Sequence, residues 1–537
     1  MRPFLPSRLA LAPVVAAALA ITATVWSQAP RYTEPFRPQY HYTPEANWMN
    51  DPNGMVYFDS EYHLFYQYNP FGDKWGHMSW GHAISPDLVH WEHLPVAIPE
   101  QDGVMAFSGS IVVDWENTSG FGDGVRPPLV ALYTGYKENP DKIQAQYAAW
   151  SRDRGRTWTQ FPGNPVLDLN STEFRDPKVF WYQPGGYWVM AVVLAKEYKA
   201  SFYRSPDLKT WAHLSDFGPA AATGGVWECP DLFELPVTGR EDESKWVLIV
   251  NIGDGAIAGG SNGQYFLGEF DGTTFVSDTV NGEIPTRWLD YGSDFYATVT
   301  WSDVPATDGR RLAIGWMNNW KYGQEVPTSP WRSAQSLVRE LSLVRDDDQL
   351  TLVQSPVCEQ SQLRGTSRAL HDLALRPEVV GLRELGVSGS ALELALVLEP
   401  GNAAGFGVDV AAGPEHRTRI GYDVKRGVLF IDRTNSGPEF HADFAGRHEA
   451  PVALRDGRLD LRVFLDGSLL EVFADGGRVT ISDQIFPPEG HDDVALYAEG
   501  GTARLVDLQA WPLRSIWPAA QPAEIEAAEA AAVVPLP

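Results

Sequence analysis

Cysteine is nearly absent from this chain of 537 residues. Cys229 and Cys358 are the two that occur, so no disulfide framework holds the fold together and no C-x-x-C pair can bind a metal. The twelve histidines show no H-E-x-x-H spacing, and no P-loop or G-x-G-x-x-G fingerprint precedes a helix. We therefore predict no metal and no cofactor. Stability must come from core burial, which a chain of this length can supply.

Basic residues are also scarce. Lysine and arginine number 42 against 69 aspartates and glutamates, which gives a net charge of −27. Such a chain repels phosphate, so nucleic acid and anionic membranes are poor candidates for partners. Nothing in the sequence indicates an oligomeric state.

Long apolar runs are missing beyond the N-terminus. There, Arg2 and Arg8 precede an apolar segment over residues 9–24, and the residues VWS follow it, as in a secretory signal. We predict a signal peptide over residues 1–27, a secreted or periplasmic protein, and no membrane attachment after cleavage. The alternative is an uncleaved anchor.

Aromatic residues and turn formers are abundant. The chain has 20 tryptophans, 49 glycines and 40 prolines, and short apolar or alternating segments bounded by Gly, Pro, Asn or Asp recur along it. Convincing amphipathic helices are missing. This pattern predicts an all-β protein, with sugar binding as one use for exposed rings.

The first 345 residues contain a repeat. SPDLVHW at 85–91 recurs as SPDLKTW at 205–211, and Asp51, Gly109, Asp176, Asp231 and Asp294 mark unit starts at intervals of 58, 67, 55 and 63 residues. Five meanders of about sixty residues indicate a five-bladed β-propeller over 33–345. An array of β-sandwiches is the alternative.

We predict a linker over 346–370, a β-sandwich over 371–515, where aliphatic strands return, and a low-complexity tail over 516–537.

Three acids stand at corresponding strand starts: Asp51 in WMNDPNG, Asp176 in FRDPKVF and Glu228 in WECPDLF. Each alone could be a cap or a turn residue. Together they suit glycoside cleavage, in which one carboxylate attacks the anomeric carbon and another, protonated, releases the leaving oxygen.

In this order the three motifs resemble those of glycoside hydrolase family 32, which comprises invertases, inulinases and levanases and pairs a five-bladed propeller with a C-terminal β-sandwich. Further matching segments cover nearly the whole chain after the signal: FYQYNP (65–70), WGHMSWGHAISPDLVHW (75–91), FSGS (107–110), YGSDFYA (291–297), GWMNNW (315–320), PTSPWRSAQSLVREL (327–341) and LLEVFADGGRVTISDQIFP (469–487). The resemblance implies a retaining β-fructofuranosidase that acts on fructans and sucrose. It implies Asp51 as nucleophile at C2 of a fructofuranosyl unit, Asp176 as transition-state stabiliser and Glu228 as general acid and base.

We expect two further groups of residues around these acids. Hydroxyl contacts are expected from Asn50, Gln67, Ser108 and Arg175. The apolar wall of a blind pocket, suited to one terminal fructose, is expected from Trp48, Trp75, Phe107 and Trp316, for each of which ordinary blade packing is the alternative. Cys229 is interpreted as a small buried apolar residue, and Asp294 as an inner-edge acid that orients its neighbours.

Other functions remain open from the sequence. A fructosyltransferase would use the same acids, a non-catalytic glycan-binding propeller would use the same funnel, and an intracellular sucrose-phosphate hydrolase would share the motifs but not the signal. The presence of all three acids argues against the binding protein.

Overall fold

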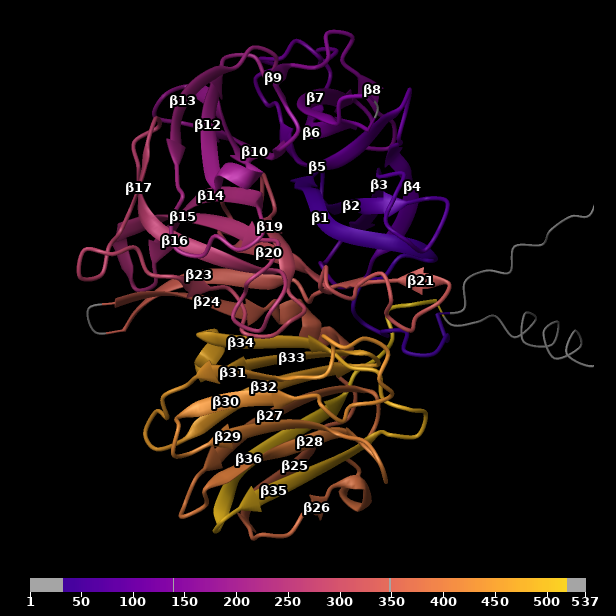
Figure 1. Ribbon diagram of the computed structural model, residues 1–537, viewed down its shortest axis with the longest axis vertical. Coiled ribbons are helices and arrows are strands. Elements are labelled where there is room, and N and C mark those ends of the chain that lie inside the picture. The colour runs from indigo at the N-terminus through magenta and orange to yellow at the C-terminus, as the bar shows by residue number, and fades with distance from the viewer. Residues whose placement is uncertain (1–31, 139, 347–348, 519–537) are drawn as a thin grey trace, which may run out of the picture.

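A computed structural model of the protein describes residues 32–138, 140–346 and 349–518 (Figure 1). Their regular secondary structure is almost entirely strands, which confirms the all-β prediction, and the short 3-10 helices are η1 (Ala195–Glu197), η2 (Cys358–Leu363), η3 (Arg383–Leu385) and η4 (Asp475–Gly477). The predicted signal peptide, and the predicted tail beyond residue 518, lie outside the described residues. Within them, no helix is long and apolar enough to cross a membrane.

The N-terminal part consists of antiparallel meanders around a common centre (Figure 1). The first sheet contains β1 (Asn47–Phe58), β2 (Glu61–Asn69), β3 (Ser79–Ser85), β4 (Glu92–Ile98) and β21 (Trp331–Arg332). The second contains β5 (Val104–Val113), β6 (Leu129–Lys137), β7 (Ile143–Ser151), β8 (Thr159–Gln160) and β9 (Leu167–Ser171). The third contains β10 (Phe174–Tyr182), β11 (Tyr187–Leu194), β12 (Lys199–Ser205) and β13 (Ala212–Phe217).

The remaining strands of this part form one ten-stranded sheet. Its strands are β14 (Trp227–Val237), β15 (Arg240–Ile252), β16 (Asn262–Phe270), β17 (Phe275–Ser277), β18 (Arg287–Trp288), β19 (Tyr296–Thr300), β20 (Arg311–Met317), β22 (Ala334–Gln335), β23 (Arg339–Asp346) and β24 (Gln349–Pro356). A single parallel pair, Val237 with Leu343, joins the group β14–β18 to the group of β19, β20, β22, β23 and β24. We interpret these halves as two blades, which with the three other sheets makes five. The late strand β21 pairs with β1, so the chain closes the ring on itself.

Each innermost strand is interrupted by a β-bulge near its start. The pairing shifts register between Met49 and Pro52 on β1, Ala106 and Gly109 on β5, Arg175 and Lys178 on β10, Glu228 and Asp231 on β14, and Tyr296 and Val299 on β19. A bulge bends a strand and redirects its side chains. The five inner strands therefore present side chains toward the axis at equivalent levels.

The stretch 346–370, predicted as a linker, contains a complete propeller strand. Asp346 on β23 faces Gln349 on β24, and β24 runs antiparallel to β23 as part of the last propeller sheet. The run of aspartates before this strand led to the linker prediction, although the strand sequence QLTLVQSP alternates polar and apolar residues. The sandwich begins at Arg368, three residues before its predicted start.

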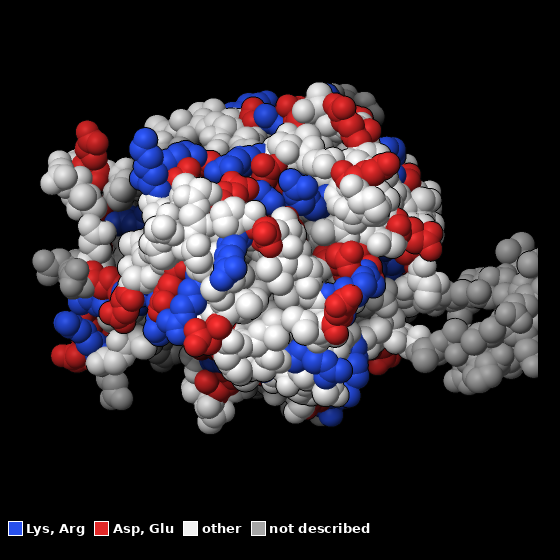
Figure 2. All heavy atoms as spheres, turned by 90° about the horizontal axis from the view of Figure 1, so that it is seen from below, with Lys and Arg blue, Asp and Glu red and all other residues white. Residues whose placement is uncertain are grey.

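The C-terminal part is a β-sandwich of two six-stranded sheets below the propeller in Figure 1. One sheet contains β25 (Arg368–Leu375), β27 (Ala391–Glu399), β32 (Leu459–Asp466), β33 (Leu469–Ala474), β34 (Val479–Gln484) and β36 (Ala503–Pro512). The other contains β26 (Val380–Gly381), β28 (Gly405–Ala412), β29 (Thr418–Asp423), β30 (Val428–Asp432), β31 (Arg447–Pro451) and β35 (Asp493–Glu499). Its core is mostly leucine, valine and isoleucine. On the end view of Figure 2, basic and acidic side chains are interspersed.

The start of the predicted tail packs against the N-terminal segment. Trp517 is buried, stacks on Tyr32 with ring centroids 4.1 Å apart, and donates from Nε1 to the carbonyl of Pro38. The low-complexity prediction therefore began too early, because the WP sequence at 517–518 looked like a continuation of the proline- and alanine-rich run.

Fully buried charges join the propeller to the sandwich. Arg339 on β23 donates to Glu471 Oε2 on β33, and its Nη1 lies 3.2 Å from Asp290 Oδ2. Glu471 also lies 2.9 Å from His41 Nε2. Burial opposes a charge on His41, but hydrogen bonds to Asp466 and Glu471 raise its pKa to about 9. The two backbones approach closely here, since a Cβ on Gly292 would lie 2.0 Å from the carbonyl oxygen of Ser482.

Replacing Glu471 by alanine should destabilise the whole protein, because it leaves two buried cations, Arg339 and His41, without a shared carboxylate. We expect a loss of about 3–5 kcal/mol in unfolding free energy, measured by denaturant titration. The matched control is Glu449→Ala, which removes a partly exposed ion pair with Arg426 in the same domain and should cost about 1 kcal/mol or less. Equal losses in the two variants would show that the buried network does not hold the domains together.

Candidate active site

The three predicted acids converge on one pocket. Asp51, Asp176 and Glu228 lie at the bulges of β1 and β10 and at the start of β14, and all three line a cavity of about 530 Å³. The other residues that line it are Asn50, Gln67, Trp75, Phe107, Ser108, Tyr136, Lys142, Gln144, Thr172, Glu173, Arg175, Lys196, Trp320 and Gln324.

Asp51 is held by two donors from neighbouring inner strands. Asn50 Nδ2 donates to Oδ1 at 3.0 Å, and Ser108 Oγ on β5 donates to Oδ2 at 2.9 Å. Asn50 is itself oriented, because its Oδ1 accepts a hydrogen bond from Trp48 Nε1 at 2.7 Å. The carboxylate is thus fixed by hydrogen bonds that favour its ionised form.

Asp176 lies deeper and adopts a left-handed backbone conformation, with φ of +65°. Its backbone N–H donates to Thr134 Oγ1 at 2.9 Å, and its Oδ2 accepts the backbone N–H of Cys229 at 2.9 Å. The Cys229 thiol lies between the two aspartates, 3.6 Å from Asp51 Oδ2 and 3.7 Å from Asp176 Oδ2. Burial and these carboxylates raise the thiol's pKa well above its usual value, as suits a buried apolar residue.

Glu228 is oriented from two sides. Arg175 Nε donates to Oε1 at 3.1 Å, and the Tyr296 hydroxyl on β19 donates to Oε2. Arg175 is fixed in turn, since its Nη1 donates to Glu173 Oε2 at 2.8 Å and to Gln144 Oε1 at 3.2 Å. Although burial opposes it, the charges of Glu228 and Asp176 raise the pKa of Arg175, so the guanidinium stays charged.

Crowding of the carboxyl groups shifts their titration. Burial, followed by the charge of Glu228, raises the pKa of Asp51 to about 6. Burial raises the pKa of Asp176 to about 7, and the charges of Glu228 and Asp51 add to this while Arg175 opposes it.

The rings at the mouth differ in part from those predicted. Trp75 is 38% exposed and meets Phe107 edge to face, and Phe107 stacks on Tyr136 at 4.7 Å. These rings line the pocket as expected.

Trp48 and Trp316 do not form its surface. Both are fully buried and pack against Trp320, with ring centroids 6.0 and 4.9 Å away, and Trp320 lines the pocket. Trp316 lies within strand β20, where its side chain belongs to the core, whereas Trp320 follows the end of that strand. The GWMNNW motif therefore reaches the pocket through Trp320 and not through the predicted Trp316.

Two side chains that matter for orientation were missed. Tyr296 belongs to the YGSDFYA motif and sits at the bulge of the fifth inner strand, as the acids do in theirs. Glu173 lies two residues before Arg175 of the RDP motif and accepts a hydrogen bond from its guanidinium. Gln67 and Ser108 are placed as expected, and Gln67 Nε2 donates to the Ala106 carbonyl at 3.1 Å.

Asp294 lies outside this pocket. It is buried at the domain interface, where Arg433 Nη1 of the sandwich donates to its Oδ2 at 2.6 Å and the Tyr322 hydroxyl donates to its Oδ1. Its role as an orienting acid therefore concerns the sandwich and not a sugar.

The arrangement provides the groups for acid–base and nucleophilic chemistry at a glycosidic carbon. The Asp51 carboxylate is fixed by hydrogen bonds, Asp176 lies deeper, and Glu228 is oriented by Arg175 and Tyr296. Aromatic rings lie at the rim of the pocket. Among the described residues, no group of three or more His, Cys, Asp or Glu side chains is arranged to hold a metal ion.

Comparisons with known proteins agree with this chemistry. Levanase of Bacillus subtilis (strain 168) is 49% identical over 493 residues, which cover 90% of this chain and 72% of the levanase. The extracellular exo-inulinase of Aspergillus awamori is 39% identical over 519 residues, which cover 90% of this chain and 96% of that protein.

Solved structures agree in fold. The crystal structure of the Aspergillus awamori exo-inulinase matches with a TM-score of 0.84 and 38% identity over 90% of this chain and 100% of that one. The fructofuranosidase of Schwanniomyces occidentalis complexed with fructose matches with a TM-score of 0.81 and 34% identity over 91% of this chain and 100% of that one.

Two family models account for nearly all of the described chain. The glycosyl hydrolases family 32 N-terminal domain matches residues 41–356, and the C-terminal domain of the same family matches residues 359–512. The resemblance inferred from the motifs is thereby confirmed, together with the propeller and sandwich that it implied. The chain belongs to glycosyl hydrolases family 32 and is a glycoside hydrolase.

Proposed function

We propose that the protein is a secreted, retaining β-fructofuranosidase that removes terminal fructose from inulin or levan and also cleaves sucrose. The observation that carries this proposal is the convergence of Asp51, Asp176 and Glu228 on one pocket, each held by named hydrogen-bond donors. The relatives named levanase and exo-inulinase support fructan as substrate, and the word extracellular in the name of the latter supports secretion.

In the first step, Asp51 attacks C2 of the fructosyl unit while Glu228 gives its proton to the departing oxygen. The C2–O bond to the leaving sugar breaks, and an ester between C2 and Asp51 forms. The donors from Asn50 and Ser108 hold the attacking carboxylate in place, which reduces the entropy lost on reaching the transition state.

In the second step, Glu228 takes a proton from water, and the water oxygen attacks C2 and releases Asp51. Two displacements at one carbon return the original configuration, so the product is formed with retention. Arg175 and Tyr296 serve both steps by keeping the Glu228 carboxyl directed into the pocket.

Asp176 would bind fructose hydroxyls and stabilise the positive charge that develops on the ring. Its position is set by two backbone hydrogen bonds, one from its own N–H and one to its carboxylate, so it needs no reorganisation during the reaction. Arg175, Asn50 and Gln67 would take the remaining hydroxyls.

The general acid can be tested by leaving-group dependence. We expect Glu228→Ala to lower kcat/KM on sucrose by about 10²–10⁴-fold, because no group then protonates the departing glucose. A p-nitrophenyl fructofuranoside, whose leaving group needs no proton, should suffer much less in the first step. Asp51→Asn should lose turnover of both substrates. Equal damage to the two substrates in the Glu228 variant would remove Glu228 from this role.

The acid side of the pH profile should depend on Ser108. Asp51 must be ionised to attack, and burial and Glu228 raise its pKa, so kcat/KM should fall on acidification with an apparent pKa above the ordinary aspartate value of about 3.9. Ser108→Ala removes a hydrogen bond that lowers this pKa, so the acid limb should move to higher pH.

The matched control is Ser110→Ala on the same strand. The Ser110 hydroxyl donates to the Pro177 carbonyl and not to a carboxylate, so the limb should stay in place. Initial rates on sucrose between pH 3 and 9 measure both variants. An unshifted limb in Ser108→Ala would contradict the assignment of Asp51.

The mode of attack follows from the shape of the site. A cavity of about 530 Å³ rimmed by Trp75, Phe107 and Trp320 suits a single terminal furanose with a neighbouring unit at the mouth. Free fructose should therefore be the product from inulin and levan at the lowest conversions, resolved by chain length. A ladder of short oligosaccharides would indicate an open groove, and kestose-type products from sucrose would indicate a fructosyltransferase.

A further inference from the structure

A second cavity lies toward the other ends of the inner strands. It measures about 640 Å³, and the residues that line it include Trp115, Lys178, Trp188, Asp231, Asp303 and Arg311. Asp176 of the active site and Trp181 of this cavity are five positions apart on β10, about 16 Å along a strand. The two cavities therefore occupy opposite ends of the propeller axis.

Side chains block the axis between the two cavities. Lys178 Nζ donates to the Thr300 carbonyl and lies 3.1 Å from Asp231 Oδ2, and Thr300 in turn donates to the same carboxylate. The void that Asp176, Lys178 and Cys229 help to line measures about 10 Å³, which is too small for a sugar. The second cavity is therefore a separate chamber and not an exit for fructose.

The second cavity presents an exposed ring in a fixed orientation. Trp75 and Trp115 are the two exposed tryptophans among the described residues, and Trp115, at 61%, is the more exposed. Its Nε1 donates to Asp303 Oδ1 at 3.0 Å, while Asp303 Oδ2 accepts the Val113 N–H at 3.0 Å. An aromatic face held in place in this way is a preorganised platform for a ligand.

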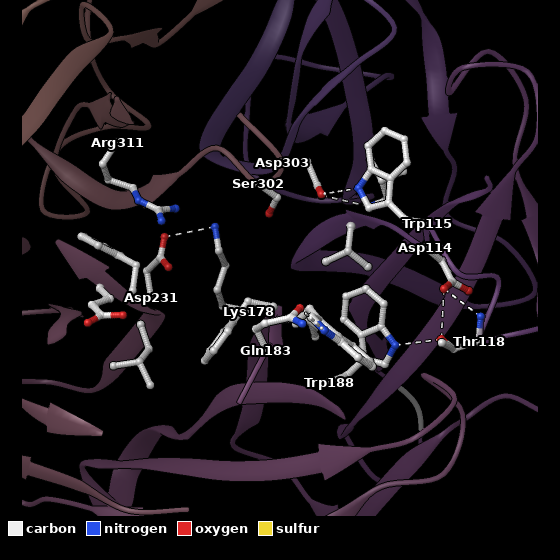
Figure 3. Close-up of a pocket in the computed structure, with 18 of the residues that line it drawn as sticks. Asp114, Trp115, Thr118, Lys178, Gln183, Trp188, Asp231, Ser302, Asp303 and Arg311 are labelled. Carbon is white, nitrogen blue, oxygen red and sulfur yellow. Dashed lines mark hydrogen bonds and ion pairs between the residues drawn. The ribbon is translucent and has the colours of Figure 1, made fainter. Parts of the chain in front are cut away.

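Side chains with hydrogen-bond donors and side chains with acceptors lie across the cavity from the Trp115 ring. Figure 3 shows Lys178, Asp231 and Arg311 on one side of the cavity and Trp115 and Trp188 on the other. Within the described part of the chain the Arg311 guanidinium makes no ion pair, and its one side-chain hydrogen bond, to the Trp301 carbonyl, is long at 3.5 Å. Asp231 Oδ1, on a fully buried side chain, also lacks a hydrogen-bond partner there.

This combination selects a class of ligand. Five lining carboxylates (Asp114, Glu116, Asp231, Glu234 and Asp303) outnumber the two lining cations, so phosphates and other anions are disfavoured. The unused donors of Arg311, the carboxylate acceptors of Glu116 and the amide donors of Gln183, whose Oε1 accepts from Trp181 Nε1 at 3.0 Å, match groups that both accept and donate, which hydroxyls do. An aromatic platform beside hydroxyl-binding groups is suited to a sugar ring.

We propose that this second cavity binds a neutral saccharide, stacked on Trp115 and hydrogen-bonded by Arg311, at a site distinct from the catalytic pocket. The proposal does not depend on the substrate preference proposed above. Only the choice of nystose and levantetraose as probes rests on that preference. In a polymer-degrading enzyme, such a site would hold one part of a chain while the distant pocket cleaves a terminus.

The test uses the full-length Asp51→Asn protein, titrated calorimetrically with nystose, levantetraose, maltotetraose and cellotetraose. We expect at least one of these sugars to show a binding event that Trp115→Ala weakens by about tenfold or more. Arg311→Met, which keeps an aliphatic chain over the Phe233 ring while removing the donors, should weaken the same event. Val276→Ala, at a side chain of similar exposure on β17, should leave it unchanged.

Turnover separates this proposal from the proposed function. In the otherwise wild-type enzyme, Trp115→Ala should leave kcat and KM for sucrose unchanged. Absence of any binding event sensitive to both Trp115→Ala and Arg311→Met would overturn the second site, as would loss of sucrose turnover in a folded Trp115→Ala protein. Failure of the wild-type enzyme to cleave sucrose and fructans would contradict the proposed function without affecting the titration.

Discussion

One backbone irregularity, repeated on each inner strand, organises this active site. A bulge at the same level of β1, β5, β10, β14 and β19 directs side chains toward the axis from strands whose partners are otherwise regular. Asp51, Ser108, Asp176, Cys229 and the neighbours of Tyr296 all sit in these bulges. The same local distortion in every blade thus brings the three acids together in one pocket.

The sandwich supplies no side chain to the pocket, yet it is connected to it. Arg433 pairs with Asp294 at the interface, and two residues further on Tyr296 donates to Glu228. Arg339, Glu471 and His41 join the same two domains by buried ionic contacts. Because buried charges tolerate little displacement, the interface restrains the strand that carries Tyr296. The sandwich is therefore best understood as a support for the fifth inner strand.

The sequence predicted the acids and the fold class because both depend on local signals. Pro177 and Pro230 lie inside the bulges that follow Arg175 and Glu228, and a residue without an N–H is tolerated there because the bulge leaves it unpaired. Pro52, directly after Asp51, is the first residue to pair again beyond the bulge of its strand. Side-chain depth was not predictable. Trp316 and Trp320 share a motif, and the end of strand β20 decides which one reaches the pocket. Strand β24 was missed because a run of acids masked its alternation.

Both ends of the propeller axis are concave, but they are built differently. At one end the acids converge, and burial, together with their mutual repulsion, raises the pKa values of Asp51 and Asp176. At the other end Lys178 neutralises Asp231 and closes the channel, leaving Arg311 and the Trp115 ring at the surface. The same strands β5, β10 and β14 line both cavities, so a propeller of this kind can carry two separate sites without extra structure. The Lys178–Asp231 pair keeps the two sites from becoming one channel.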